Sequence, residues 1–147
     1  MPTGADKAVA MFEQGYNCAQ SVLACCGAAL GVSRDLAVRL AQAFGGGMSH
    51  LGQTCGAVTG ALMVIGLKHS KANEGEQGKQ TAMRLAQELA QRFKARNGSI
   101  NCNELLGCDP GTPEGIQMCR ERNLFRTLCP RLVRDAAEIV EELLKGT

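Results

Sequence analysis

Four cysteines of the 147-residue chain each stand where a helix is predicted to begin: Cys18, Cys55, Cys102 and Cys129. The first turn of a helix presents unpaired N–H groups and the positive end of the helix dipole. A cysteine in that position ionises more readily, and the thiolate is the form that attacks disulfides and binds metals. If the fold brings these four helix starts together, they predict a redox site or a metal site.

Three further cysteines are expected to serve other purposes. Cys25 lies two turns after Cys18, about 10 Å further along the helix axis. One tetrahedral metal, with sulfur ligands at about 2.3 Å, cannot bind both. Cys25 and its neighbour Cys26 are therefore predicted to fill the core as small hydrophobic residues. Cys119 falls in the middle of a predicted helix, where we expect a structural or incidental thiol.

The eighth cysteine, Cys108, lies just past the short helix that Cys102 begins. The segment Asn101–Glu104 is typical of a capping box, in which side chains satisfy the free N–H groups of a helix start. Gly107 is expected to end this helix. Five residues separate the two cysteines, so the intervening turn can bring both to one site.

Caps, glycines and helical spacing of apolar residues predict helices along nearly the whole chain. The expected segments are about 3–14, 18–30, 33–44, 55–69 and 79–97, then short helices that begin near 102 and 113, and a last helix from Cys129. A break at Gly45–Gly47 and a polar linker at 70–78 interrupt them. No segment alternates with the period of a strand. We expect an all-α fold over residues 1–147, a single domain of about five longer helices plus short connecting helices.

Apolar residues three or four positions apart predict the faces that these helices present to one another. Inward positions are expected at Ala82, Leu85, Leu89, Phe93, Val133, Ala136, Val140 and Leu143, and a third helix carries Leu36, Leu40 and Phe44 on one face. Gly56 and Gly60 are four residues apart, so another backbone can approach their helix closely. That neighbour lies either within the monomer or across the interface of a homodimer.

The composition excludes several classes of function. Hydrophobic residues make up 45% of the chain and charged residues 20%, and the net charge of +2 gives no basis for binding nucleic acid or a membrane. With no Trp, one Tyr and four Phe, the chain lacks aromatic residues for stacking bases. No secretory signal is visible, and the longest apolar stretch, 55–67, is too short to cross a bilayer. We expect a cytoplasmic protein, whose cysteines stay reduced and act as ligands or redox groups.

Five stretches carry a combined pattern: Gly15–Ala19, Phe44–Gly47, Cys55–Gly60, Ile100–Gly107 and Cys129–Pro130. Together they resemble a bacterial and archaeal family named after its cysteines, the C-GCAxxG-C-C redox-active proteins, over about residues 10–143. The family name places Gly before the second cysteine, whereas Thr54 precedes Cys55 here and Gly56 follows it. The resemblance implies a helical domain with a redox or metal-cluster role, and it assigns the family's cysteines to Cys18, Cys55, Cys102 or Cys108, and Cys129.

The leading hypothesis is a small thiol redox protein whose partner is a redox protein or a small thiol. In its dithiol form, Cys55 attacks, and Cys18 or Cys102 resolves the mixed disulfide. In its cluster form, an iron–sulfur centre or a zinc ion is held by Cys18, Cys55, Cys129 and one of Cys102 and Cys108. The alternative is a structural zinc protein, or a helical interaction protein without turnover. Haem is not expected, because the chain lacks a Cys-x-x-Cys-His sequence.

Overall fold

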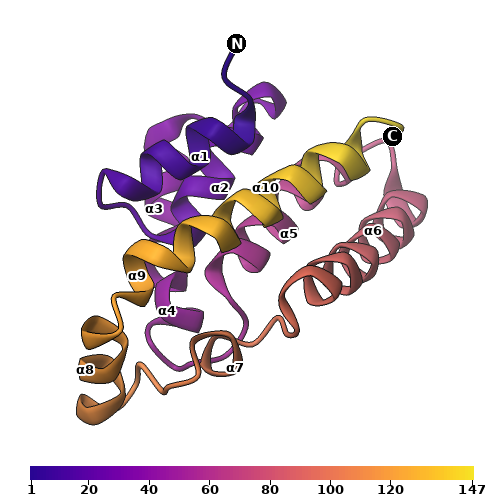
Figure 1. Ribbon diagram of the computed structural model, residues 1–147. Helices are drawn as coiled ribbons and strands as arrows, with labels where there is room; N and C mark the ends of the chain where they lie inside the picture. Colours follow the sequence, from indigo (N-terminus) through magenta and orange to yellow (C-terminus); the bar gives the residue numbers. More distant parts are fainter.

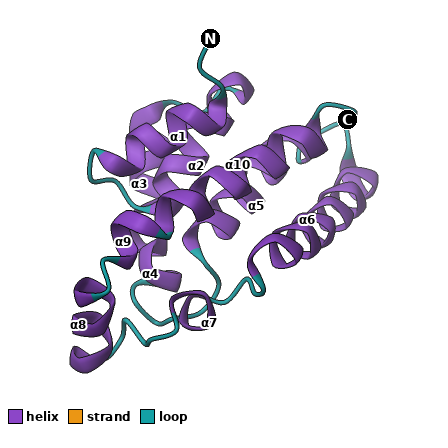
Figure 2. Ribbon diagram, in the orientation of Figure 1, coloured by secondary structure: helices purple, strands orange, loops and turns teal.

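The computed structural model describes residues 1–147 and consists of helices joined by short loops (Figures 1 and 2). Its α-helices are α1 (Gly4–Glu13), α2 (Cys18–Gly27), α3 (Arg34–Ala41), α4 (Gly45–Met48), α5 (Gly56–His69), α6 (Gly75–Asn97), α7 (Cys102–Leu106), α8 (Pro113–Glu121), α9 (Leu124–Thr127) and α10 (Cys129–Leu144). Two short 3₁₀ turns, Ala28–Leu30 and Gln42–Phe44, follow α2 and α3. The only β-type pairing is an isolated bridge between Thr54 and Asn101, so the all-α prediction is confirmed.

Three helices form the centre of the molecule. Helices α2, α5 and α10 pack against one another, α1 lies on α2 and α10, and α6 lies on α5 and α10 (Figure 1). Together they enclose a core of 26 buried residues, in which Phe93, Met11 and Leu23 are among the largest side chains. None of these helices combines the length and the apolarity that a bilayer span requires.

The inward faces predicted for α6 and α10 are confirmed for all but one residue. In α6, Leu85, Leu89 and Phe93 are buried, whereas Ala82 is only partly buried. The four predicted positions of α10 are all buried: Val133, Ala136, Val140 and Leu143. Helix α6 begins at Gly75 and not near residue 79, since the Gly78 N–H donates to the Glu74 carbonyl oxygen at 3.2 Å and so continues the helical pattern backwards.

Helix α3 uses a different face from the one that its leucines suggested. Leu36 and Leu40 are 44% and 57% exposed, and the buried residues of this helix are Ala37 and Ala41. Small residues let α3 lie close to α2, so the short side chains and not the long ones form the contact.

The glycine pair of α5 faces α2 within the same chain. A Cβ atom at Gly60 would lie 2.8 Å from the Ala19 carbonyl oxygen, which is backbone and cannot move aside. A Cβ atom at Gly56 would lie 3.2 Å from the Cβ of Cys18. The close approach that the two glycines predicted is therefore between α2 and α5, and it draws the start of α2 toward the start of α5.

Residues 46–50, which overlap the segment labelled α4, form a left-handed turn and not a regular α-helix, where a glycine loop was expected. The φ angles of its five residues, two glycines followed by Met48, Ser49 and His50, lie between 55° and 68°. Non-glycine residues pay roughly 1–2 kcal/mol each for that conformation. Hydrogen bonds hold the turn: the Ser49 hydroxyl donates to the Ala43 carbonyl oxygen at 2.7 Å, and the His50 N–H donates to that of Gly45 at 3.2 Å.

Candidate functional site

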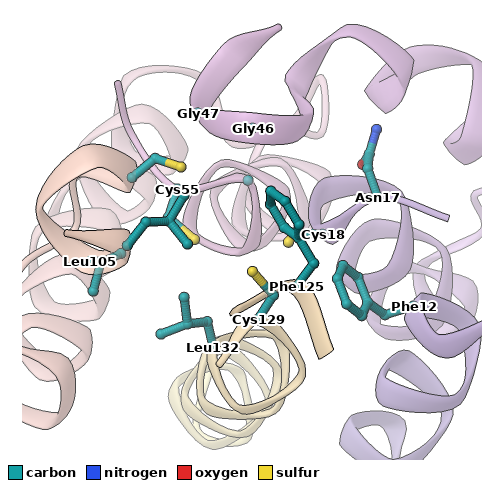
Figure 3. A pocket seen from close by; sticks show the side chains of 13 residues that line it. Phe12, Asn17, Cys18, Gly46, Gly47, Cys55, Leu105, Phe125, Cys129 and Leu132 are labelled. Carbon is teal, nitrogen blue, oxygen red and sulfur yellow. The ribbon is translucent and has the colours of Figure 1, made fainter. Parts of the chain in front are cut away.

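Four helix starts converge at one end of the central helices. Cys18, Cys102 and Cys129 are the first residues of α2, α7 and α10, and Cys55 immediately precedes α5. All four cysteines line a single cavity of about 130 Å³. Figure 3 shows the sulfur atoms of Cys18, Cys55 and Cys129 pointing into the same space. The structure thus brings together four cysteines that are far apart in the sequence.

Asn17 fixes the position of Cys18. Its Oδ1 accepts the Gln20 N–H at 2.8 Å, and the Gln20 side chain accepts the Asn17 N–H at 2.9 Å, which forms a capping box at the start of α2. The Asn17 Nδ2 also donates to the carbonyl oxygens of Ala41 and Gln42 at 3.3 and 3.1 Å. One side chain therefore caps α2 and ties it to the end of α3.

A short backbone pairing places Cys102 beside Cys55. The Cys55 N–H donates to the Ile100 carbonyl oxygen at 2.8 Å, and the Cys102 N–H donates to that of Gln53 at 2.6 Å. Asn101 begins α7 as predicted, because its Oδ1 accepts two backbone N–H groups of the first turn. The loop before α5 and the loop before α7 are thus held as neighbours.

The cavity wall is apolar and carries no charged side chain. Besides the four cysteines, it is lined by Phe12, Asn17, Gly46, Gly47, Gly56, Leu105, Leu106, Phe125 and Leu132. Cys55, Cys102 and Cys129 are only 4%, 8% and 6% exposed. Phe12 and Phe125 are partly exposed and flank the cavity, as does Cys18 (Figure 3). Two aromatic rings therefore form part of the cavity wall.

Gly47 connects the left-handed turn to the cavity. With φ at 68°, it adopts a conformation that side chains disfavour. A Cβ atom there would lie 2.6 Å from the Cβ of Cys102. The glycine thus permits both the turn and the close passage of the backbone over the cysteine.

Cys18 and Cys129 influence each other's acidity, and their pKa values shift in opposite directions. The hydrogen bond to Cys129 raises the pKa of Cys18 well above its ordinary value, and burial and the other cavity sulfurs raise it further. The same hydrogen bond lowers the pKa of Cys129, against the opposing effect of burial. Cys129 is therefore the better thiolate of the pair.

Cys55 and Cys102 are weaker acids than an ordinary cysteine. Burial raises the pKa of Cys55 to about 11, although the N–H groups of Ala57 and Val58 at the start of α5 lower it. Burial also raises the pKa of Cys102 to about 12. The helix start acts on Cys55 in the expected direction, but the loss of water outweighs it. The assignment of Cys55 as the attacking thiolate stays a prediction, and the acidities of the thiols favour Cys129 for that role.

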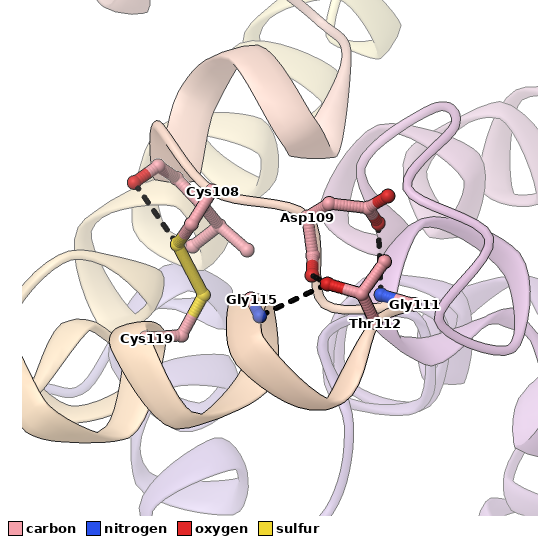
Figure 4. The surroundings of a disulfide bond; sticks show 7 residues. Cys108, Asp109, Gly111, Thr112, Gly115 and Cys119 are labelled. Carbon is pink, nitrogen blue, oxygen red and sulfur yellow. Dashed lines mark hydrogen bonds between the residues drawn. A yellow bond between two sulfur atoms is a disulfide. The ribbon is translucent and has the colours of Figure 1, made fainter.

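Cys108 does not join the cavity. It forms a disulfide with Cys119 on α8, with the two Cα atoms 6.5 Å apart (Figure 4). Cys108 and Cys102 therefore do not share the cavity. Cys119, expected as a structural or incidental thiol, is half of a disulfide. The helix start near Pro113 was predicted from the sequence, but the disulfide was not. A chain can connect two cysteines 11 positions apart in many geometries, and only some of these bring the two sulfurs together.

Cys25 and Cys26 lie outside the cavity, partly buried against the main core as predicted. The Cys25 sulfur is 3.9 Å from the Met11 sulfur, and the Cys26 sulfur is 3.8 Å from Glu141 Oε1. Sequence reasoning missed the two phenylalanines of the cavity. Phe125 belongs to α9, a single turn without a capping side chain, so no pattern marked it.

The four cavity thiols are not arranged as metal ligands. No group of three or more His, Cys, Asp or Glu side chains in the chain could hold a metal ion. Thiolates suit zinc and iron–sulfur centres by their softness. The donor atoms thus fit such a centre, but their arrangement does not.

Comparison with known proteins gives one match. A family model described as "Putative redox-active protein (C_GCAxxG_C_C)" matches residues 16–143, nearly the whole chain and all eight cysteines. The comparisons with curated proteins and with solved structures gave no match.

Proposed function

The chain belongs to the C_GCAxxG_C_C family, and on that premise we propose that it is a thiol redox protein in which Cys18 and Cys129 cycle between a dithiol and a disulfide. The observation that supports this most is that these two thiols, remote in the sequence, line one apolar cavity. There each shifts the pKa of the other, which lowers the pKa of Cys129 and keeps Cys18 protonated beside it. Such a pair is what a two-step disulfide exchange needs.

Cys129 is the attacking residue in this proposal. Its thiolate attacks one sulfur of an oxidised substrate, R–S–S–R′, which forms a Cys129–S–S–R mixed disulfide and releases R′–S⁻. Cys18 then loses its proton to a departing thiolate and attacks the Cys129 sulfur. The Cys18–Cys129 disulfide forms and R–S⁻ leaves. Two electrons pass from the protein to the substrate, and two substrate thiols are the products.

Cys55 and Cys102 keep the surroundings of this pair uncharged. Their raised pKa values leave both as neutral thiols at neutral pH. Ionised neighbours would repel a thiolate on Cys129 and raise its pKa. The apolar wall favours a substrate disulfide next to an apolar or aromatic group, which the two phenylalanines can contact. The partner is thus a protein or a small thiol compound with such a group.

Dipyridyl disulfide, an uncharged aromatic disulfide, tests the assignment of the two cysteines. The wild-type protein should release two thiopyridones per chain in the fast phase and end with a Cys18–Cys129 disulfide. Cys18→Ala should release one and retain a pyridyl adduct on Cys129. Cys129→Ala should lose the fast phase, whereas the control Cys25→Ala should behave as wild type. A fast adduct on Cys55 in place of Cys129 would refute the proposal.

A metal centre is the second candidate, and one observation favours it: four thiols line the same cavity. The side chains of Cys18, Cys55, Cys102 and Cys129 would hold an iron–sulfur centre or zinc only after they rotate toward a common point. Metal analysis and a visible spectrum of protein purified without oxygen separate the candidates. Colour with bound iron supports the iron–sulfur centre, and stoichiometric colourless zinc supports the structural alternative. Neither is expected if the dithiol proposal holds.

A further inference from the structure

The Cys108–Cys119 disulfide lies against the cavity that contains the proposed redox pair. Cys119 is fully buried and belongs to a small cluster with Cys102, Leu106 and Cys129. Three of these residues, all but Cys119, line the cavity. The cluster therefore packs Cys119 with residues that line the cavity.

The two ends of this disulfide have different surroundings. Cys119 is on α8 with 0% of its surface exposed, whereas Cys108 is in the loop after α7 and is partly exposed. The Cys108 sulfur lies 3.5 Å from the carbonyl oxygen of Leu106, the last residue of α7 (Figure 4). Cys108 is therefore the more exposed end of the disulfide, and Cys119 is enclosed by its neighbours.

The segment between the two cysteines holds its shape through its own hydrogen bonds. Asp109 Oδ1 accepts the Gly111 N–H at 2.8 Å, and the Thr112 hydroxyl accepts the Gly115 N–H at 2.9 Å and so caps α8 (Figure 4). Pro113 occupies the first helical position, which it favours. Since these contacts define the turn and the helix start, a covalent link is not needed to define them.

From this placement we propose that the Cys108–Cys119 disulfide is the point at which an external thiol delivers electrons to the cavity pair. The proposal rests on the function proposed above. It assigns a role to two cysteines that the chemistry in the cavity does not use. It also accounts for a disulfide that joins a partly exposed cysteine to a buried one in the same cluster as Cys129.

The first half of the exchange opens both disulfides. An external thiolate, R–S⁻, attacks Cys108, which forms Cys108–S–S–R and frees the Cys119 thiolate. Cys119 attacks the Cys129 sulfur of the Cys18–Cys129 disulfide. The product is a Cys119–Cys129 disulfide, and the Cys18 thiolate leaves and takes up a proton.

The second half restores the starting pair. A second R–S⁻ attacks the R sulfur of Cys108–S–S–R, releases R–S–S–R and frees the Cys108 thiolate. Cys108 attacks Cys119, which reforms the Cys108–Cys119 disulfide and frees Cys129. In sum, two external thiols are oxidised to one disulfide, and the Cys18–Cys129 disulfide is reduced to two thiols.

Cys108→Ser tests the relay because it should trap the internal intermediate. In this variant Cys119 can attack Cys129, but no Cys108 thiol remains to release it. After oxidation, peptide mapping should find a Cys119–Cys129 disulfide that the control Cys25→Ser lacks. Absence of that species from correctly folded Cys108→Ser protein would overturn the relay.

Reduction of the oxidised protein by glutathione supplies a second readout. In Cys108→Ser/Cys119→Ser, reduction of the Cys18–Cys129 disulfide should be at least about tenfold slower than in wild type. In wild-type protein, acid quenching during the reaction should trap glutathione on Cys108, a readout that needs no variant. Equal rates, together with no glutathione on Cys108, would overturn the relay and leave the cavity pair intact. If no Cys18–Cys129 disulfide forms in wild type, the proposed function fails and the relay fails with it.

Discussion

At the scale of single residues, two opposing effects decide which thiol ionises. The start of α5 lowers the pKa of Cys55 through two backbone N–H groups, yet burial raises it to about 11. Cys129 is also buried, but a hydrogen bond from Cys18 outweighs that burial. A helix start is therefore not sufficient to activate a cysteine, and a neighbouring S–H donor makes the difference here.

The first prediction concerns the acidity of Cys129. Its alkylation by iodoacetamide should rise with pH around a midpoint below 9.0, the ordinary thiol value, because its pKa is lowered. Cys18→Ala removes the donor, so the midpoint should move to higher pH. Peptide-resolved alkylation rates measure this, with Cys25→Ala as the control that leaves the midpoint in place. An unchanged midpoint in Cys18→Ala would contradict the hydrogen bond.

The second prediction concerns stability in alkali. In the unfolded chain Cys55 ionises near 9.0, whereas in the folded protein its pKa is about 11. Between these two values the unfolded state has lost a proton that the folded state keeps, so the free energy of unfolding falls as pH rises. The loss should reach roughly 2–3 kcal/mol at the upper value.

Urea denaturation of wild type and Cys55→Ala across this pH range isolates the contribution of Cys55. Other groups ionise in the same range, so the measured quantity is the difference between the two proteins. Wild type should lose more stability than the variant. Parallel curves would show that Cys55 is not buried as a neutral thiol.

At the scale of elements, the site depends on how closely α2 and α5 approach each other. Gly60 faces the backbone of α2, and Gly66 on the same helix has no atom within 4 Å of the position of its missing Cβ. Substitution of Gly60 therefore tests the packing of α5 against α2, whereas substitution of Gly66 tests only the helix propensity of the residue.

Substitution of these glycines is the third prediction. Gly60→Ala should lower the free energy of unfolding by roughly 1–3 kcal/mol, because the new methyl group meets backbone that must shift. Gly66→Ala should raise it by about 0.5–1 kcal/mol, because alanine favours a helix. Thermal or urea unfolding measures both. If the two variants shift stability in the same direction, the close contact between α2 and α5 is misplaced.

The helices themselves could largely be predicted from the sequence, since their caps are local. Asn17, Ser33 and Asn101 each cap the helix that follows them. The buried face of α3 could not be predicted in this way. Its leucines are its most hydrophobic residues, but its smaller alanines allow the closer contact with α2 and are the residues that are buried. The left-handed turn is held by contacts outside itself, such as that of Ser49 with Ala43, and no local pattern encodes those.

The candidate site was predictable only in part. Four helix-start cysteines could be selected from spacing and caps, but their meeting depends on the approach of α2 to α5 and on the pairing of residues 53–55 with 100–102. The relative acidity of the four thiols could not be predicted, because burial and the Cys18–Cys129 contact arise only in the folded chain. The Cys108–Cys119 disulfide was missed for the same reason.

At the scale of the whole molecule, the main core extends well beyond the cavity. The core of 26 buried residues includes Cys55, and Cys18 packs against it, whereas Cys129 belongs to a small cluster of four buried residues. Changes deep in the main core should therefore alter stability and leave the redox pair intact.

The fourth prediction tests this separation. Leu89→Ala should cost roughly 2–5 kcal/mol, because Leu89 is fully buried and its removal leaves a cavity. The control Met83→Ala on the same helix should cost far less, because Met83 is 57% exposed. Below its melting temperature, Leu89→Ala should form the Cys18–Cys129 disulfide as wild type does. An unaltered melting temperature would contradict the placement of Leu89 in the core.

A redox titration resolved by cysteine tests the central claim most directly. Wild-type protein is equilibrated in glutathione buffers of increasing oxidation, its free thiols are alkylated, and each cysteine is quantified by mass spectrometry. Cys18 and Cys129 should disappear together in one two-electron step, joined by a disulfide, while Cys55 and Cys102 remain alkylated. Joint oxidation of Cys55 with Cys102, or independent oxidation of Cys18 and Cys129, would contradict the account.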